Sequence, residues 1–570
     1  MRNAGIIATT AVLFLAMLAS VARSQQTLDT SGIRIRVERA DAIRGPEGYG
    51  EDNAYTSYQI GAGRFRNFTT NACWLSADNP NCTQALDGGA AWDATAAPRT
   101  SARGDGSPLP TGSYHLDVLN STTQTQAWAR CGQWLNSVLV SGGKLYGFSH
   151  GENPKEGDTI CGNYRTHHKT MTLWTSPVGS NAGLAGQWTN PTLIIDATDG
   201  DGGDRESGEG DCSAIADNTY AYLFCRHPTQ TAEDPGRAYS TAVARAPLTR
   251  LTNFIKYNNG WGHEPGVNGA DSDLVGKIWG TASTTSNQLG TGASVWRDQG
   301  WAMLLGITDA GFRGLKASFT RLSNLQTNAI GFTTLPVPLF VQETNANGGY
   351  PYGGNPAHNL YIYPSVVSLV DGTRTWDLTK KNQFLLAYAF VPPHNNLSHR
   401  MLAMRSVTVS KSSAPQDPQV LVALTSRYDP TYKQYYSSTQ PVAYGIDTAF
   451  SYVPGTFSQI SVDTVGYLPQ LAQNHPISQG QTLTKIVECR SSAPWPAGHP
   501  DHLITTESCD SNYNEETVAG YSYPRKPATG SSVQIYRCSS SANQTHWVSI
   551  SNTCDGGGDA EKSLGWILTK

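Results

Sequence analysis

The stretch Ser137-Val-Leu-Val-Ser-Gly-Gly-Lys-Leu-Tyr-Gly-Phe148 decides the fold of the first two thirds of the chain. Two apolar runs flank a Gly-Gly pair, which is typical of a β-hairpin. The same shape recurs at 213–224, 293–304 and 365–388. Hairpins spaced about 75 residues apart predict blades of a β-propeller. Residues 33–68 could supply a further blade or the closing strand, so about five blades are expected.

The last third of the chain contains three copies of one pattern. Each copy is a strand, a loop, a second strand and a closing strand end with a Gly-aromatic pair. The copies open at 422–428, 485–490 and 533–538, continue at 434–439, 501–506 and 545–550, and close at 465–468, 519–522 and 564–567. Short β units that cannot each bury a core should pack about a shared axis, as in a β-trefoil. By analogy such a module binds carbohydrate, although a purely structural cap is the alternative.

These patterns predict an all-β protein, a five-bladed β-propeller followed by a three-repeat, β-trefoil-like module. Residues 1–24 have a positive side chain near the start (Arg2), then an apolar run and small residues near the end, as in a cleavable secretory signal peptide. The propeller should span 25–410 and the three-repeat module, called the three-copy module below, 418–570. Residues 411–417, rich in Ser, Pro and Ala, should form the linker. The protein is therefore expected to be secreted and extracellular.

Charged residues are scarce in this chain, at 15%, while Gly (57), Tyr (26) and Trp (14) are abundant. This composition favours strands and turns over long helices. The net charge is −4 and no basic block is present. Nucleic acid and membrane are therefore not expected as partners, and we expect a monomer.

Ten cysteines form pairs that are close in sequence, and an even count in an exported chain indicates disulfides. Connectivity does not follow from sequence alone, but the cysteines of the second and third copies align and support the last two pairs. No C-x-x-C spacing favours a metal site. The expected pairs are Cys73–Cys82, Cys131–Cys161, Cys212–Cys225, Cys489–Cys509 and Cys538–Cys554.

The first candidate site follows the opening hairpin, at Ser149-His150-Gly151-Glu152. His150 and Glu152 are two residues apart, so they share one side of a continuing strand. An imidazole and a carboxylate side by side could serve as general acid or base. The alternative is an ordinary polar strand end.

The second candidate site lies before the second hairpin, where several acids are concentrated between Asp204 and Cys212. Asp211 is nearest to the strand, which the expected Cys212–Cys225 disulfide would hold in place. Its carboxylate is therefore the best positioned for catalysis. The acids could instead bind a structural Ca²⁺ or simply solvate a loop, and their spacing lacks the full Ca²⁺-loop pattern.

The third candidate site is the loop between Glu343 and His358, which mixes a carboxylate, amides, tyrosines and glycines. Aromatic rings can cover the apolar faces of a sugar, while polar groups bind its hydroxyls. We expect this loop to contact a glycan, and the alternative is a Gly-rich surface loop. The candidate binding residues are Tyr350, Tyr352, Asn355 and His358.

The chain lacks the G-x-S-x-G, G-x-x-x-x-G-K-[ST], G-x-G-x-x-G and H-E-x-x-H motifs. A zinc or nucleotide-dependent enzyme is therefore not expected, and no cofactor is predicted.

Three segments, 145–152, 210–224 and 363–369, resemble the five-bladed-propeller glycoside hydrolases, the superfamily of arabinanases, arabinofuranosidases and levansucrases. The resemblance covers about 45–410. It implies three carboxylates from separate blades that converge on an axial pocket as acid, as base or nucleophile, and as orienting group. Glu152, Asp211 and Glu343 could form this trio, and Asp93 competes as the first-blade acid. The module resembles trefoil-type or lectin-like accessory modules of secreted polysaccharide enzymes.

The function expected on this basis is that of a secreted glycoside hydrolase acting on a polysaccharide, with arabinan-type polymers as candidates. Two alternatives remain open. A polysaccharide lyase would use His150 or Tyr352 as base and Arg226 to neutralise a uronate. A non-catalytic glycan-binding or adhesion protein would use the same aromatic loops without paired acids.

Overall fold

The computed structural model describes residues 28–43, 50–51, 56–61, 64–69, 71–72, 90–94, 114–116, 132–153, 168–184, 186–197, 207–228, 239–258, 260–262, 264–269, 289–307, 314–328, 330–340, 359–367, 382–391, 401–413, 417–429, 434–440, 461–471, 480–492, 501–542 and 545–569. Regular structure in these residues is β, apart from short 3-10 helices at Arg297–Gln299, Leu322–Gln326 and Cys554–Gly556. The predicted all-β class is confirmed. Within the described residues, no helix has the length and apolar character needed to cross a membrane. The predicted signal peptide lies outside the described residues.

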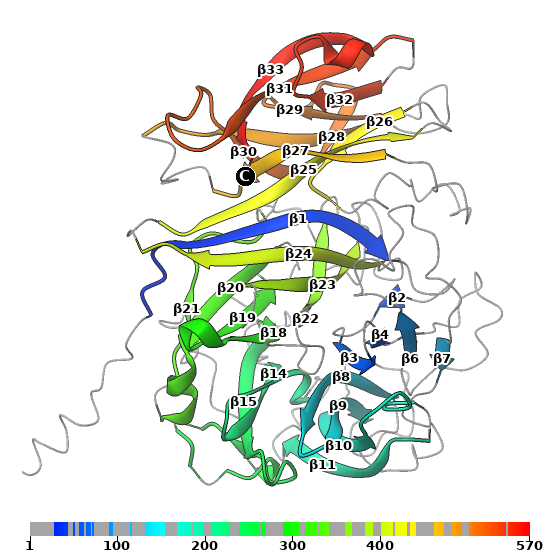
Figure 1. Cartoon of the computed structure of the whole chain (residues 1–570), viewed down its shortest axis with the longest axis vertical. Coiled ribbons are helices and arrows are strands. Elements are labelled where there is room, and N and C mark those ends of the chain that lie inside the picture. Colours follow the sequence, from blue (N-terminus) through cyan, green and yellow to red (C-terminus); the bar gives the residue numbers. More distant parts are fainter. Residues whose placement is uncertain are drawn as a thin grey trace, which may run out of the picture.

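Five mainly antiparallel sheets follow one another along the described part of the first two thirds of the chain (Figure 1). The first contains β3 (Thr56–Gly61), β4 (Arg64–Thr69), β6 (Ala90–Ala94) and β7 (Tyr114–Leu116). The second contains β8 (Gly132–Ser141), β9 (Lys144–Asn153), β10 (His168–Pro177) and β11 (Thr189–Ala197), with β12 (Ser207–Gly208) beside β10 and β17 (Val267–Gly269) beside β11. The third contains β13 (Gly210–Ala216), β14 (Tyr220–Pro228), β15 (Tyr239–Pro247) and β16 (Ile255–Lys256).

The fourth sheet contains β18 (Leu289–Trp296), β19 (Trp301–Ile307), β20 (Leu315–Arg321) and β21 (Thr333–Thr334). The fifth contains β22 (Leu360–Val367), β23 (Gln383–Val391), β24 (Met401–Lys411) and β1 (Ile33–Ile43). A separate pair is formed by β2 (Gly50–Glu51) and β5 (Asn71–Ala72).

The four predicted hairpins are all present, as β8–β9, β13–β14, β18–β19 and β22–β23. In the first, Ser141 pairs with Lys144, so that Gly142 and Gly143 form a two-residue turn. Both glycines have positive φ, 55° and 72°. This turn needs positive φ at both central residues, which only glycine adopts freely. The Gly-Gly pair is therefore what closes the hairpin.

The first strands of the five sheets contact one another in a closed series. β3 contacts β8, β8 contacts β13, β13 contacts β18, β18 contacts β22, and β22 contacts β3. Apolar side chains of neighbouring sheets fill the space between them: Phe148, Leu223 and Leu304 share one core although they come from the second, third and fourth sheets. The sheets are thus held face to face by burial of apolar surface.

β1 is the outer strand of the fifth sheet, where it pairs antiparallel with β24. Its alternating Ile33, Ile35 and Val37 are buried in a core shared with that sheet. The sequence left open whether 33–68 forms a further blade or the closing strand. The structure divides this segment between two sheets, because Ile33–Ile43 pairs at the edge of the fifth sheet whereas β3 and β4 begin the first.

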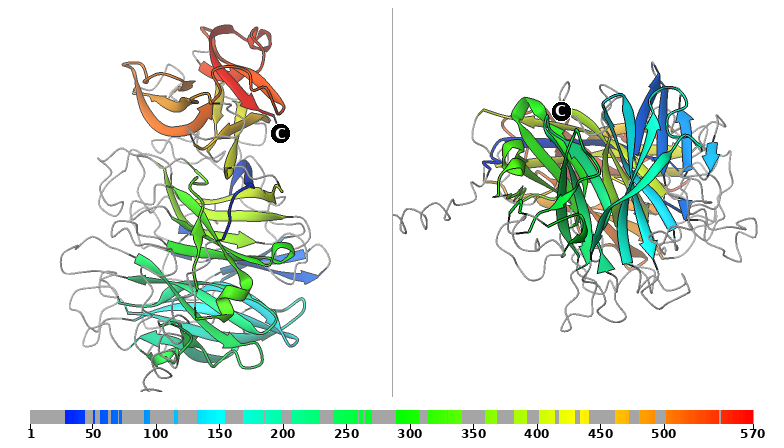
Figure 2. Two further views of the ribbon diagram at one scale, coloured as in Figure 1. Left: turned by 90° about the vertical axis from the view of Figure 1, so that its left-hand side faces the viewer. Right: turned by 90° about the horizontal axis from the view of Figure 1, so that it is seen from below.

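β1 also joins the two parts of the chain. Its other edge pairs in parallel with β25 (Gln419–Asp429), so that one ten-stranded sheet runs from β22 to β32. Val420 and Val422 of β25 are buried in the same core as Val37. Figure 2 shows the last third of the chain at one end of the molecule, beyond this junction. Lys411, placed in the predicted linker, is the last residue of β24, because its pairing with Ile33 extends the sheet that far.

Each of the three copies is one three-stranded unit with the same strand order. The units are β25, β26 (Gln434–Ser438) and β27 (Ser461–Pro469); β28 (Thr484–Ser491), β29 (His502–Thr505) and β30 (Tyr513–Ser522); and β31 (Ser532–Ser540), β32 (Thr545–Ser549) and β33 (Asp559–Leu568). In each, the first strand lies between the other two. The short strands β26, β29 and β32 contact one another, which brings the copies around a common centre.

The closing glycines explain how the copies interlock. Gly466, Gly520 and Gly565 pair with Leu424, Ile486 and Ile535, and each pairing is followed by a register shift typical of a β-bulge. A Cβ at Gly466 would collide with Ile567 of the third copy. Likewise Gly520 lies against Leu468 of the first copy, and Gly565 against Ser522 of the second. Each copy therefore receives the strand end of another through its own glycine.

Three of the predicted disulfides are confirmed: Cys212–Cys225, Cys489–Cys509 and Cys538–Cys554. The last two occupy equivalent places in the second and third copies, as their alignment predicted. The other two pairs, Cys73–Cys82 and Cys131–Cys161, lie outside the described residues.

A buried carboxylate connects the first and second copies. Glu488 of β28 is 2% exposed and accepts hydrogen bonds from the Ser438 hydroxyl and from the backbone N–H and hydroxyl of Thr439. Burial, together with the charge of Glu516, raises the pKa of Glu488 to about 7, although these hydrogen bonds act in the opposite direction. The carboxyl group therefore titrates near neutral pH.

We expect Glu488 to make the three-copy module less stable as pH rises. Its pKa is higher in the folded chain (about 7) than the ordinary value of 4.5, so the folded state retains a proton that the unfolded state loses. The retained proton contributes fully to the free energy of unfolding below pH 4.5. This contribution, about 3 kcal/mol, is lost as pH rises through about 7. Thermal melts of the wild type and Glu488→Gln between pH 4 and 8 measure it. Identical pH slopes in the two proteins would contradict this expectation.

Candidate functional site

The first candidate pair lies on one face of the second sheet. β9 pairs with β8 and with β10, which places Trp134 opposite His150 and Lys169 opposite Glu152. Directly opposite residues of antiparallel strands share a face. The Trp134 and His150 rings are 5.4 Å apart. This face is turned toward β13 of the third sheet, which contacts both β9 and β10.

Asp211 stands at a bulge at the start of β13. Gly210 pairs with Arg226 and Ser213 with Phe224, so Asp211 and Cys212 together oppose Cys225. Asp211 has a φ of +51°, a left-handed conformation that Asp and Asn adopt more readily than most residues. The disulfide from Cys212 to Cys225 ties the bulge to β14. The backbone here is therefore fixed on both sides of the carboxylate.

A glycine next to the bulge allows the two sheets to approach. A Cβ at Gly210 would collide with Nδ1 of His150. The sequence Gly210-Asp211 thus brings the Asp211 backbone close to the imidazole ring. The Asp211 N–H donates a hydrogen bond of 3.2 Å to His150 Nδ1.

The Asp211 carboxylate is buried between two cations. Its Oδ2 is 3.1 Å from Lys169 Nζ and 3.3 Å from Arg226 NH1, and all three side chains are less than a tenth exposed. Burial opposes ionisation, but the positive charges outweigh it and hold the pKa of Asp211 well below its usual range. Asp211 is therefore a fixed negative charge. A group so tightly paired is poorly suited to accept or donate a proton.

The hydrogen bonds of His150 fix its tautomer. A backbone N–H always donates, so Nδ1 must carry the lone pair and the proton lies on Nε2. Nε2 is 3.3 Å from Oε1 of Glu152 and donates to it. His150 is 3% exposed, whereas the Glu152 side chain is 21% exposed. Glu152 is therefore the member of the group that solvent or substrate can reach, and a buried imidazole holds its side chain in place.

The structure thus brings together four residues that the sequence singled out, His150, Glu152, Asp211 and Arg226. Glu343, Tyr350, Tyr352, Asn355 and His358 lie outside the described residues. The backbone of Asp93 belongs to β6, and its side chain is not among those described. The catalytic and binding roles assigned to all these residues stay predictions.

Sequence reasoning missed Lys169 and Trp134. Neither lies in a recognisable motif. Lys169 reaches the site because the pairing of β10 with β9 places it opposite Glu152. Its place one strand after the Glu152 hairpin is the only signal that could have indicated it.

No group of three or more potential metal ligands occurs in the part of the chain that the structure describes. Two acids of the suggested Ca²⁺ loop, Asp204 and Glu206, lie outside that part, so the structural Ca²⁺ site stays a prediction.

No protein-family model matches the chain, and no curated protein matches it. Among solved structures, a protein of unknown function from Dyadobacter fermentans is 10% identical, covers 66% of this chain and 99% of its own, and has a TM-score of 0.36. The GH43_1 enzyme from Xanthomonas citri complexed with xylose is 13% identical, covers 65% and 93%, and has a TM-score of 0.35. A levansucrase from B. megaterium is 11% identical, covers 66% and 85%, and has a TM-score of 0.34. At these low values, the function is argued from the chain's own residues.

Proposed function

We propose that this chain is a secreted glycoside hydrolase that cleaves a polysaccharide with carboxylates held between the sheets of a propeller. The observation that carries the proposal is the accessible Glu152 carboxylate beside the buried, ionised Asp211. The accessible carboxylate can meet a substrate, while the buried one holds the surrounding side chains in place. The three confirmed disulfides are consistent with an extracellular location.

The closed series of contacts among β3, β8, β13, β18 and β22 supports a five-bladed propeller. In such a fold the innermost strand of each blade surrounds the axis. Asp211 is at the start of β13, one of these strands. Glu152 is near the end of β9, in the neighbouring blade. Two blades would thus supply the carboxylates at one place.

In this proposal Glu152 acts as base or nucleophile. The hydrogen bond from His150 Nε2 holds its side chain in place, and its carboxylate can take a proton from water or attack the sugar carbon. Asp211 acts as the orienting group: its carboxylate fixes Lys169 and Arg226, and its backbone N–H fixes the His150 ring that holds Glu152. A second, protonated carboxyl group must give its proton to the leaving oxygen as the glycosidic bond breaks. Glu343 and Asp93 are the candidates for that acid.

The three-copy module is proposed to hold the glycan. Tyr428 and Tyr435 of the first copy are partly exposed, and Tyr435 stacks on Trp547 of the third copy with ring centroids 4.4 Å apart. Partly exposed tyrosine rings are suitable for stacking on sugar faces. A purely structural module is the alternative.

The lyase alternative is less compatible with the geometry. A lyase base needs an imidazole nitrogen that reaches substrate, but His150 is buried and both ring nitrogens have partners. Arg226 is 6% exposed and directed at Asp211, so it does not present its charge to a uronate. Tyr352 lies outside the described residues and stays a candidate.

The full chain should be incubated with a panel of polysaccharides that includes arabinan. We expect new reducing ends without the ultraviolet absorbance of an unsaturated sugar. An unsaturated product would favour the lyase. Binding without any product would contradict both enzymatic proposals and favour an adhesion protein.

A further inference from the structure

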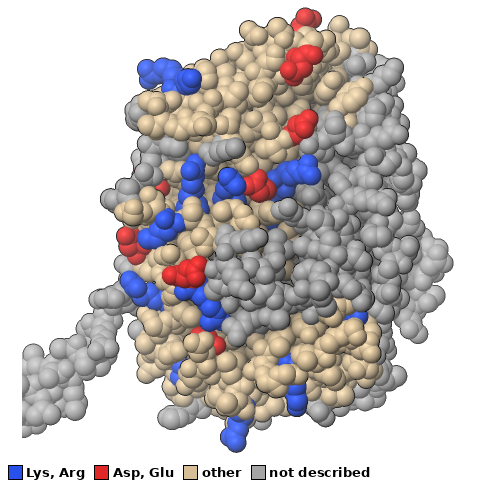
Figure 3. All heavy atoms as spheres, in the orientation of Figure 1, with Lys and Arg blue, Asp and Glu red and all other residues tan. Residues whose placement is uncertain are grey.

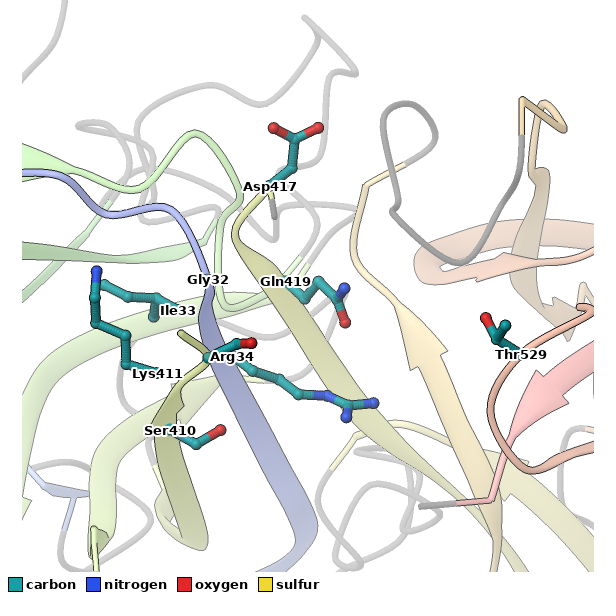
Figure 4. Close-up of a pocket in the computed structure, with 9 residues that line it drawn as sticks. Gly32, Ile33, Arg34, Ser410, Lys411, Asp417, Gln419 and Thr529 are labelled. Atoms are coloured by element: carbon teal, nitrogen blue, oxygen red, sulfur yellow. The ribbon is translucent and has the colours of Figure 1, made fainter. Parts of the chain in front are cut away.

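A pocket of about 380 Å³ lies where the fifth sheet meets the three-copy module (Figure 4). Three segments line it: the start of β1, the end of β24 together with the start of β25, and the loop before β31. The volume is within the range of small-ligand sites. The proposed hydrolytic site between the second and third sheets shares no residue with this pocket.

Arg34 gives the pocket an uncompensated charge. Its side chain is partly buried, and its electrostatic partners in the described part of the chain are Arg36, which is also positive, and the phenol of Tyr523. Burial lowers the pKa of Arg34, and the positive charge of Arg36 lowers it further. Arginine nevertheless stays protonated in proteins, so an anion at this position would be favourable.

Gln419 gives the pocket an unsatisfied acceptor. The residue is 5% exposed, and its side-chain oxygen has no hydrogen-bond partner in the described part of the chain. Buried polar atoms are nearly always hydrogen-bonded, so a partner is missing. In Figure 4 the side chains of Gln419 and Arg34 both extend toward the side of the pocket where Thr529 lies. An acceptor and a charged donor therefore face the same space.

The charges around the pocket are mainly positive. Lys411 is held by the backbone carbonyls of Asp29 and Ser31 and lies over the Trp301 ring. Asp417 is the acid that lines the pocket, and it is exposed and points away from Arg34 in Figure 4. Figure 3 shows several Lys and Arg side chains on the face of the molecule at the height of β1, with fewer acids among them. The described lining of the pocket itself carries two cations, Arg34 and Lys411, and one acid, Asp417.

We propose that this pocket binds a carboxylate-bearing sugar, the uronate unit of an acidic glycan. Arg34 would pair with the carboxylate, for which a guanidinium can supply two parallel N–H donors. The Gln419 side-chain oxygen would accept a hydrogen bond from a sugar hydroxyl. That the anion is carried on a sugar rests on the proposed function, whereas the anion site itself rests on Arg34 and the pocket.

The test is isothermal titration calorimetry, in which the full chain is titrated with glucuronate and, separately, with glucose at the same ionic strength. The two sugars differ in the carboxylate, so we expect saturable binding of glucuronate and none of glucose. Arg34→Gln should weaken glucuronate binding by at least about tenfold, since hydrogen bonds to charged groups contribute strongly. Arg525→Gln, which removes an exposed cation outside the pocket lining, is the matched control and should leave binding within about twofold of wild type.

Asp417→Asn keeps the proposal testable if Arg34→Gln does not fold. Removal of this exposed negative charge should strengthen glucuronate binding by about two- to threefold. No binding of glucuronate to the wild type, or binding unaffected by both variants, would overturn the proposal. Acetate bound as tightly as glucuronate would overturn the sugar assignment. Absence of hydrolysis on the polysaccharide panel would overturn the proposed function and leave this binding result unchanged.

Discussion

Asp211→Asn should destabilise the sheets around it by about 3–5 kcal/mol, because Lys169 and Arg226 would lose the carboxylate they share. Asn also adopts the left-handed conformation found at this position, so the substitution removes the charge without adding backbone strain. Urea unfolding monitored by tryptophan fluorescence, with and without Asp211→Asn, measures the loss. An unchanged unfolding midpoint would show that the ion cluster does not stabilise the fold.

The charge of Lys169 provides a control for this prediction. Asp211→Asn combined with Lys169→Met removes one carboxylate and one of its cations, so part of the stability should return.

The stabilising contribution of Asp211 depends on pH in a defined direction. Because the pKa of Asp211 is lowered on folding, its contribution is present above the unfolded value of about 3.9 and is lost as pH falls below it.

Glu152→Gln should reduce kcat for glycan hydrolysis by about 10²- to 10⁴-fold, since glutamine can neither accept a proton nor attack the sugar. The fold should be retained, because glutamine can still accept the hydrogen bond from His150 Nε2 through its side-chain oxygen. Reducing-end assays together with a thermal melt separate the two effects.

Asp196→Asn is the matched control for Glu152→Gln. Asp196 accepts a 2.6 Å hydrogen bond from His168 Nε2 in the same sheet, and its side chain is 27% exposed against 21% for Glu152. It is not part of the Asp211 cluster. A comparable loss of activity in both variants would show that the effect of Glu152→Gln is general to the sheet.

The local parts of this fold could be predicted from sequence, and the long-range partners could not. The Gly142-Gly143 turn and the alternation of Ile33, Ile35 and Val37 identify strands because both signals lie within a few residues. The partners of β1, however, are β24 and β25, more than 350 positions away, and alternation does not specify a partner. The predicted separation of propeller and module therefore missed that one strand joins them.

The candidate site shows the same limit. His150 and Glu152 could be paired from their spacing, because residues two apart share a face of a strand. That Asp211 meets Lys169 depends on a bulge and on packing of two sheets, neither of which leaves a motif. The closing glycines could be predicted in part. Their repetition is visible in the sequence, but only the structure shows that they are contact points between the copies.

The most direct test of the central claim, that Glu152 is a working carboxylate of a glycoside hydrolase, is chemical rescue. Glu152→Ala should be assayed on an aryl glycoside of the sugar that the polysaccharide panel identifies, with and without azide. We expect very low turnover without azide, and restored release of the aryl alcohol with formation of a glycosyl azide when azide occupies the vacated space. Wild-type turnover by Glu152→Ala in the absence of azide would contradict the account.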